Sequence, residues 1–146
     1  MTREYPLAPI VGVGAVLLDG DRVLLIQRGH EPMKGQWSLP GGALEVGETL
    51  VEGVQREVLE ETGLEVEPVS IIEVFDRISR DAEGRVQFHY VLVDYVCRLT
   101  GGTLCCATDA MDARWARRDE LNDVAPFTVA VIEKAFRQHE SGSVRD

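Results

Sequence analysis

The chain has 146 residues, of which 45% are hydrophobic and 27% are charged, an ordinary globular composition with enough length for one hydrophobic core. A net charge of -10 disfavours nucleic acid polymers and anionic membranes as partners, because both would be repelled. Without a signal peptide or an apolar run that could span a bilayer, the sequence predicts a cytoplasmic protein, with a single domain over residues 1–146 and a frayed tail at 141–146.

The first elements are predicted to form a β-hairpin after a loose lead-in. Residues 10–18 are an apolar, β-branched run, and residues 23–26 form a second run after a turn at 19–21. Arg28 follows the hairpin, at the start of a loop. Trp37 lies further along and is predicted to pack in the core or to clamp the next loop.

A glycine-rich segment followed by a helix is predicted next. Residues 41–48 contain three glycines and two acidic residues, which favours an irregular, shaped loop. Thr49 and Glu52 form a capping-box pattern at the start of a helix, and Gly63 can end it after roughly three to four turns. Apolar residues at steps of three and four predict its core-facing stripe, formed by Val51, Val54 and Val58.

Three acidic residues of this helix are predicted to converge on a neighbouring face. Glu57, Glu60 and Glu61 are related by steps of three and four, although an acidic helix face is often merely solvated. The preceding segment resembles a phosphate-binding loop, except that Glu48 replaces the phosphate-binding lysine. Acid beside phosphate requires a cation between them, and Mg²⁺ binds carboxylates together with substrate phosphates. The pattern therefore indicates a metal-bridged phosphate site.

Two long strands and a final helix are predicted in the second half of the chain. Residues 69–75 and 86–97 have strand patterns and are joined across 81–84. The second strand carries apolar residues on both faces, as a central strand of a layered fold would. Residues 126–139 form the last predicted helix. No catalytic role is predicted for the cysteines and histidines, which lack a metal-ligand spacing: Cys97, Cys105, Cys106, His30, His89 and His139.

Residues 42–64 resemble the Nudix box at every position that this motif defines. Gly42 is followed after five residues by Glu48, and after seven more by the run Arg56-Glu57-Val58-Leu59-Glu60-Glu61-Thr62-Gly63-Leu64. The resemblance implies an α/β (α+β) fold, an α/β/α sandwich around a mixed β-sheet. It also implies a hydrolase that cleaves a nucleoside diphosphate linked to another group, with Mg²⁺ or Mn²⁺ as cofactor and a small nucleotide as partner.

The resemblance also implies roles for individual residues. Arg56 would hold nearby carboxylates in place, and Glu48 would support the junction between loop and helix. The metal ligands would be three glutamates and one backbone carbonyl, those of Glu57, Glu60, Glu61 and Gly42. The substrate would contact Arg28, Gly41 and Gly42.

The identity of the general base stays open at this point. Many Nudix relatives carry a further acid just before a tryptophan-containing strand. Here that region holds aspartates, of which Asp109 is the better candidate and Asp112 the second. Glu57 and Glu45 are alternatives, since a base must reach the attacking water directly or through one further water. No cysteine or serine nucleophile and no covalent intermediate is expected.

An ADP-ribose-like substrate is favoured among several alternatives. Residues 28–30 and 75–77 resemble small bacterial ADP-ribose pyrophosphatases, although residues 78–80 stand where the better-defined ADP-ribose enzymes have a proline. A MutT-like nucleoside triphosphate pyrophosphatase is the alternative within the family. The intact box, and a length without room for a helix-turn-helix module, favour an enzyme over a non-catalytic nucleotide sensor or an acidic interaction module. The pattern leaves a homodimer open.

Overall fold

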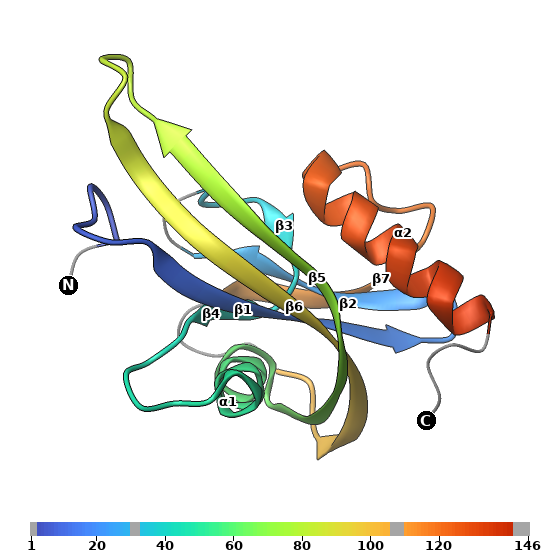
Figure 1. Cartoon of the computed structure of the whole chain (residues 1–146). Helices are drawn as coiled ribbons and strands as arrows, with labels where there is room; N and C mark the ends of the chain where they lie inside the picture. Colours follow the sequence, from blue (N-terminus) through green and yellow to red (C-terminus); the bar gives the residue numbers. More distant parts are fainter. Residues whose placement is uncertain (1–2, 30–32, 106–109, 142–146) are drawn as a thin grey trace.

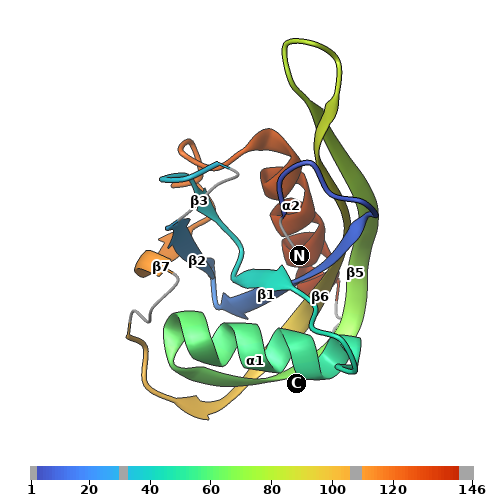
Figure 2. The ribbon, with the colours of Figure 1, turned by 90° about the vertical axis from the view of Figure 1, so that its left-hand side faces the viewer.

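The computed structural model of the chain describes residues 3–29, 33–105 and 110–141. Within these ranges, two helices lie on opposite sides of a β-sheet (Figure 1 and Figure 2). The helices are α1 (Leu50–Thr62) and α2 (Pro126–Glu140). The strands are β1 (Ile10–Asp19), β2 (Arg22–Arg28), β3 (Trp37–Ser38), β4 (Gly41–Ala43), β5 (Leu64–Arg80), β6 (Val86–Gly102) and β7 (Ala110–Arg117). This arrangement is the α/β/α sandwich that the sequence predicts.

The sheet is mixed, with the strand order β3-β2-β1-β6-β5. β1 and β6 run parallel, from Ile10 opposite Tyr90 to Leu17 opposite Cys97, whereas β5 and β6 form a long antiparallel hairpin. Two further strands pair off this path, β4 with β1 and β7 with β2. The first half of β1 therefore pairs with β4, and its last residues pair with β2.

Residues 93–97 of β6 are buried on both faces, as predicted, whereas residues 86–92 are only partly buried. On one face, a cluster of buried strand residues packs against Val54 and Val58 of α1. On the other face, a second cluster packs against Ile132 and Phe136 of α2. Each large apolar side chain that is fully buried contributes roughly 1.5–3 kcal/mol, so the two clusters hold both helices against the sheet.

Helix α1 begins and ends as its sequence predicts. The Glu52 backbone N–H donates to the Thr49 hydroxyl at 3.1 Å, and the Thr49 backbone N–H donates to the Glu52 carboxylate at 2.9 Å. This is a complete capping box. Gly63 has φ 76°, the left-handed conformation that favours glycine, and its N–H donates to the Leu59 carbonyl.

The predicted apolar stripe of α1 is only partly correct. Val54 and Val58 are buried, each with 1% of its surface exposed, but Val51 is 41% exposed. In the first turn it is Leu50 that packs against the buried cluster. The prediction for Val51 was therefore wrong, because Leu50, and not Val51, faces the sheet in the first turn of the helix.

The glycine-rich segment does not begin as a loop. Gly41–Ala43 forms strand β4 and pairs antiparallel with Gly12, Val13 and Gly14 of β1. Backbone pairing does not depend on side chains, so a segment with weak strand propensity still forms a ladder here. β5 also begins earlier than predicted, at Leu64, directly after the helix cap.

The N-terminal lead-in is attached to the β5–β6 hairpin, which projects beyond the rest of the sheet (Figure 1). The Tyr5 hydroxyl donates to the Asp81 carboxylate at 2.8 Å, and the Tyr5 backbone N–H donates to the Gln87 carbonyl at 2.7 Å. The described part of the lead-in is therefore not loose. Neither α1 nor α2, the helices found within the described ranges, is long and apolar enough to cross a membrane.

Candidate active site

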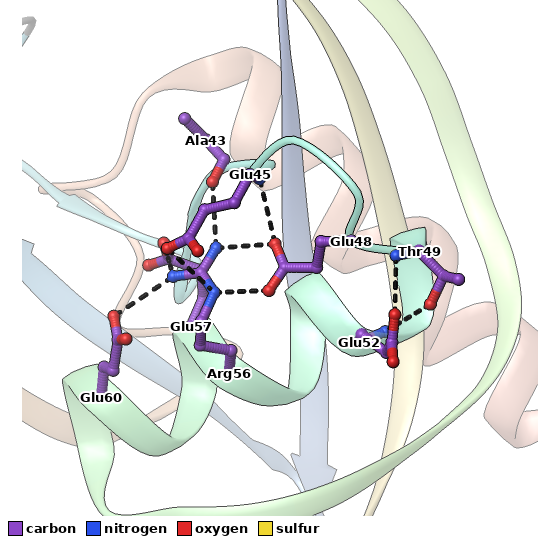
Figure 3. A network of polar contacts seen from close by, with 8 residues as sticks. All are labelled: Ala43, Glu45, Glu48, Thr49, Glu52, Arg56, Glu57 and Glu60. Carbon is purple, nitrogen blue, oxygen red and sulfur yellow. Dashed lines mark hydrogen bonds and ion pairs between the residues drawn. The ribbon is translucent and has the colours of Figure 1, made fainter.

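Arg56 of α1 joins the helix to the loop that precedes it (Figure 3). Its Nε and Nη2 donate to the two carboxylate oxygens of Glu48, at 2.6 and 2.9 Å. Nη2 also donates to the Ala43 carbonyl at 3.1 Å. The Glu48 carboxylate accepts a further hydrogen bond from the Glu45 backbone N–H at 3.0 Å. These bonds fix the loop against the helix, and the bond from Arg56 holds the pKa of the Glu48 carboxyl below its usual value.

The same guanidinium gathers other carboxylates of the box. Nη1 of Arg56 donates to Glu57 at 2.8 Å and to Glu60 at 3.3 Å, and Nε lies 3.5 Å from Glu45 (Figure 3). The Glu57 side chain is 10% exposed, whereas that of Glu60 is 44% exposed. Burial raises the pKa of Glu57, and Arg56 opposes that rise. The pKa of Arg56 itself is raised, chiefly by its bond to Glu48.

The buried glutamates of α1 lie against the glycines of β4. A Cβ atom on residue 42 would lie 2.6 Å from both carboxylate oxygens of Glu57, so only glycine leaves room for this carboxylate. One turn along the helix, the buried Glu61 carboxylate accepts a hydrogen bond from the Gly41 backbone N–H at 2.7 Å. α1 and β4 thus bring together four of the residues that the resemblance assigns to metal and substrate.

The donor groups in this region fit a hard divalent cation by their chemistry. A small cavity of about 40 Å³ is bounded by Arg28, Gly41, Gly42, Glu57 and Glu61, among others. Carboxylate and carbonyl oxygens are the ligands that Mg²⁺ and Mn²⁺ prefer. The described residues contain no cluster of three or more His, Cys, Asp or Glu side chains already placed around one point. Arg56 and the Gly41 N–H occupy carboxylate oxygens that a cation would use.

A larger cleft lies on the other side of β4, between the sheet and the start of α2. Its volume is about 130 Å³, against about 40 Å³ for the small cavity, and part of it is open to solvent. Aromatic residues and arginines are part of its lining, among them Trp37, Phe75, Tyr90, Phe127, Arg3, Arg28 and Arg77. Arg3, Arg28, Gly41 and Gly42 line this cleft as well as the small cavity. The two hollows therefore meet over the β4 glycines.

Two arginines lie over aromatic rings that line the cleft. The Arg77 guanidinium lies 4.1 Å from the centre of the Phe127 ring, and that of Arg114 lies 4.4 Å from Trp37. Trp37 is partly buried and packs against the cluster on the α2 side, so it is a core residue as well as a cleft wall. Burial lowers the pKa of Arg77.

The structure describes three of the four candidate general bases. Glu45 and Glu57 both lie beside Arg56. Asp112 lies within β7 opposite Gln27, and not in a loop before that strand as the sequence predicted. Asp109 lies outside the described residues, so the prediction for it stays open.

Asp94 lies within the predicted strand at residues 86–97, and no function was predicted for it. In the structure it lies on β6, is 7% exposed and lines the large cleft. Burial raises its pKa to about 6. The available signal was a single acid within the otherwise apolar run of residues 91–96.

Comparison with protein families and curated proteins agrees with this geometry. A model of the NUDIX domain matches residues 8–138. An ADP-ribose pyrophosphatase from Methanocaldococcus jannaschii is 35% identical over 136 residues, which cover 93% of this chain and 78% of that protein. A human 8-oxo-dGDP phosphatase is 37% identical over 115 residues, which cover 76% of this chain but only 33% of that protein.

Solved structures show the same fold. A MutT NUDIX hydrolase from Burkholderia pseudomallei matches with a TM-score of 0.75 and 30% identity, covering 87% of this chain and 98% of that one. The NUDIX domain of Shewanella oneidensis NrtR, crystallised with ADP-ribose, matches with a TM-score of 0.69 and 28% identity, covering 90% and 89%. From the family model, the relatives and the fold together, the chain belongs to the NUDIX family and is a pyrophosphohydrolase.

Proposed function

We propose that this protein hydrolyses the pyrophosphate bond of a small nucleoside diphosphate linked to another group, with an ADP-ribose-like substrate and Mg²⁺ or Mn²⁺ as cofactor. The observation that carries the proposal is the meeting of two hollows over β4. Buried glutamates of α1 lie on one side, and a larger cleft with aromatic residues in its lining lies on the other. The likeness to the archaeal ADP-ribose pyrophosphatase, and to a NUDIX domain crystallised with ADP-ribose, supports the choice of substrate.

The residues divide the work by position. The aromatic cleft binds the nucleoside, and Arg28, which borders both hollows, binds the phosphates that pass over Gly41 and Gly42. The cation ligands are Glu57, Glu60, Glu61 and the Gly42 carbonyl. When bound, the cation neutralises phosphate oxygens and lowers the pKa of a bound water.

Arg56 and Glu48 act as positioning residues in this proposal. Their paired hydrogen bonds hold the loop to the helix, and Arg56 orients the Glu57 carboxylate. The proton of the attacking water goes to a carboxylate. The candidates for that base are Glu45, Glu57, Asp109 and Asp112.

The test is hydrolysis of ADP-ribose with Mg²⁺, followed as release of AMP. The wild type is expected to turn over. Glu60→Gln and Glu61→Gln are each expected to lower kcat on the order of 10²–10⁴-fold, because each removes a negative oxygen ligand. Glu83→Gln is the matched control, since it removes the same charge at the exposed tip of the β5–β6 hairpin and should keep full activity. The metal assignment is wrong if both site variants turn over normally.

A second candidate substrate is a nucleoside diphosphate or triphosphate with a guanine-type base, as in a MutT-like enzyme. The buried Asp94 carboxyl in the cleft favours it, and the similarity to the human 8-oxo-dGDP phosphatase supports it. The same assay with GTP and 8-oxo-dGDP compares the two candidates. No nucleoside monophosphate from ADP-ribose, dinucleotides or nucleoside triphosphates, with either cation, would overturn the proposed function.

A further inference from the structure

Asp94 is a buried acid inside the cleft without a partner of its own. It lines the cleft and is 7% exposed, yet its carboxylate forms no hydrogen bond or ion pair with any group in the described part of the chain. Glu73 lies opposite it on β5, but Glu73 is paired with Lys134 of α2 at 3.2 Å. Buried polar groups in folded proteins nearly always have a partner, so this carboxylate is a strong candidate for contact with a ligand.

The neighbouring strand is shaped around this carboxylate. Gly14 of β1 lies opposite Asp94 in the parallel ladder. A Cβ atom on residue 14 would collide with an Asp94 carboxylate oxygen, so the absence of a side chain lets the carboxyl group lie across β1. Gly12 has the same relation to Leu92, whose Cδ2 would lie 2.7 Å from a Cβ atom on residue 12. Two glycines on β1 thus leave the cleft floor to side chains of β6.

The position of Asp94 relative to the other cleft residues indicates which part of a nucleotide it meets. It lines the large cleft but not the small cavity beside the α1 glutamates, whereas Arg28 lines both. The cleft lining also includes the aromatic residues Phe75, Tyr90 and Phe127, a residue type on which bases stack. A substrate with its phosphates near Arg28 would therefore bring its base, and not its phosphates, to Asp94.

We propose that the Asp94 carboxylate accepts hydrogen bonds from the edge of the substrate's base and thereby selects a guanine-type base over adenine. The inference rests on the proposed function, because it requires the nucleoside to lie in this cleft, and it changes the preferred base of the ADP-ribose-like substrate from adenine to guanine. An ionised carboxylate is an acceptor only. The guanine edge presents two adjacent donors, the ring N1–H and the exocyclic amine. The adenine edge presents one amine beside a ring nitrogen whose lone pair faces the carboxylate.

The test uses three substrates that differ only in the base: GDP-ribose, IDP-ribose and ADP-ribose. Their base edges offer two donors, one donor, and one donor beside an acceptor. At pH 8, where Asp94 is ionised, kcat/KM of the wild type is expected to fall in that order, with GDP-ribose ahead of ADP-ribose by about 10-fold to 100-fold. Asp94→Asn replaces two acceptors by one acceptor and one donor, which match adenine, so the ranking is expected to reverse.

Two further variants separate recognition from a structural effect. Asp94→Ala should lose the ranking without reversing it. Glu73→Gln changes the acid opposite Asp94 but does not line the cleft, so it should keep the wild-type ranking. Thermal unfolding of each variant checks that it is folded. An unchanged ratio of GDP-ribose to ADP-ribose in Asp94→Asn overturns the proposal, and so does an equal change in KM for all three substrates.

A different result would count against the proposed function itself. If the wild type hydrolyses none of the three substrates with Mg²⁺ or Mn²⁺, the pyrophosphatase proposal for this substrate class fails. Base selection is then measured by calorimetry with GMP and AMP. Tighter binding of GMP by the wild type and of AMP by Asp94→Asn would support the role of Asp94, and equal affinities would overturn it.

Discussion

At the level of single residues, the site depends on the lack of a side chain at Gly42. Gly42 and Glu57 lie 15 positions apart in the sequence, yet the glutamate carboxylate fills the space that a Cβ atom of residue 42 would occupy. The backbone of β4 thereby lies directly against a buried acid of α1. A glycine at the start of the box and a glutamate within the helix are thus two halves of one contact.

Gly42→Ala is predicted to reduce turnover while the protein stays folded. The added Cβ atom would lie 2.6 Å from the Glu57 carboxylate, so this carboxylate must move away from β4 and from the proposed cation site. We expect kcat for ADP-ribose to fall on the order of 10²-fold or more, since small displacements in an active site are costly. Gly101→Ala is the control, because its Cβ atom would meet only the Glu65 side chain at 3.1 Å. Equal activity in both variants would contradict the assignment.

The burial of Asp94 also leads to a prediction about how the stability of the fold depends on pH. Burial raises its pKa from 3.8 to about 6, with the Glu73 charge as a second cause. The fold thus favours the protonated acid. The associated stability is fully present below pH 3.8 and is lost as the pH rises through about 6. A shift of this size corresponds to about 3 kcal/mol between the two limits, as an order of magnitude.

Asp94→Asn should remove this dependence, because the amide does not titrate. The free energy of unfolding is measured in urea between pH 4 and pH 8. As the pH rises, this free energy should increase for the variant relative to the wild type, so the variant becomes the more stable of the two by comparison. Other acids titrate in this range in both proteins, so the difference between the two is the quantity to compare. A difference that is constant with pH would contradict the burial of an ionisable group at this position.

At the level of elements, α1 combines two kinds of buried residue on one face. Val54 and Val58 fix the helix against the sheet, and this contact carries Glu57 and Glu61 against β4. The valines supply the free energy that holds the acids in place, since burial of acid is unfavourable alone. A helix with the same glutamates and a weaker apolar stripe would expose them to solvent.

The helix was predictable from its sequence and the adjacent strand was not. The capping box at Thr49, the stop at Gly63 and the spacing of the glutamates are local signals, and each is found in the structure. β4 forms because Gly41–Ala43 pairs with β1, a strand that lies almost thirty residues earlier in the sequence. No local pattern in a glycine-rich segment encodes that pairing. The position of Asp112 within β7 has the same origin.

At the level of the whole molecule, the site exists because β1 changes partners. The first half of β1 pairs with β4 and its end pairs with β2. The helices α1 and α2, on opposite faces of the sheet, contribute residues to two hollows that meet at β4. The acidic helix was predictable from its periodicity, and the layered fold from the resemblance of residues 42–64 to the Nudix box. The cleft and the buried Asp94 were not, because they depend on the register between strands distant in sequence.

The overall charge gives a prediction for cation binding. The protein carries a net charge of -10, and Arg56 forms ion pairs with Glu57 and Glu60 of α1. A cation that binds these carboxylates in the folded chain, and not in the unfolded one, stabilises the fold by mass action. Mn²⁺ at about 100 times its Kd should add about 2.7 kcal/mol, which raises Tm by roughly 5–10 °C for a chain of this size.

The measurement is thermal unfolding of three proteins with and without Mn²⁺, at constant ionic strength. The wild type and Glu83→Gln should show the full rise in Tm. Glu57→Gln should show a much smaller rise, although it removes a buried acid and is expected to be more stable without the cation. General screening of the negative charge would raise Tm equally in all three proteins. Such equal shifts would contradict a specific site, because Glu57 and Glu83 carry the same charge and differ only in where the fold places them.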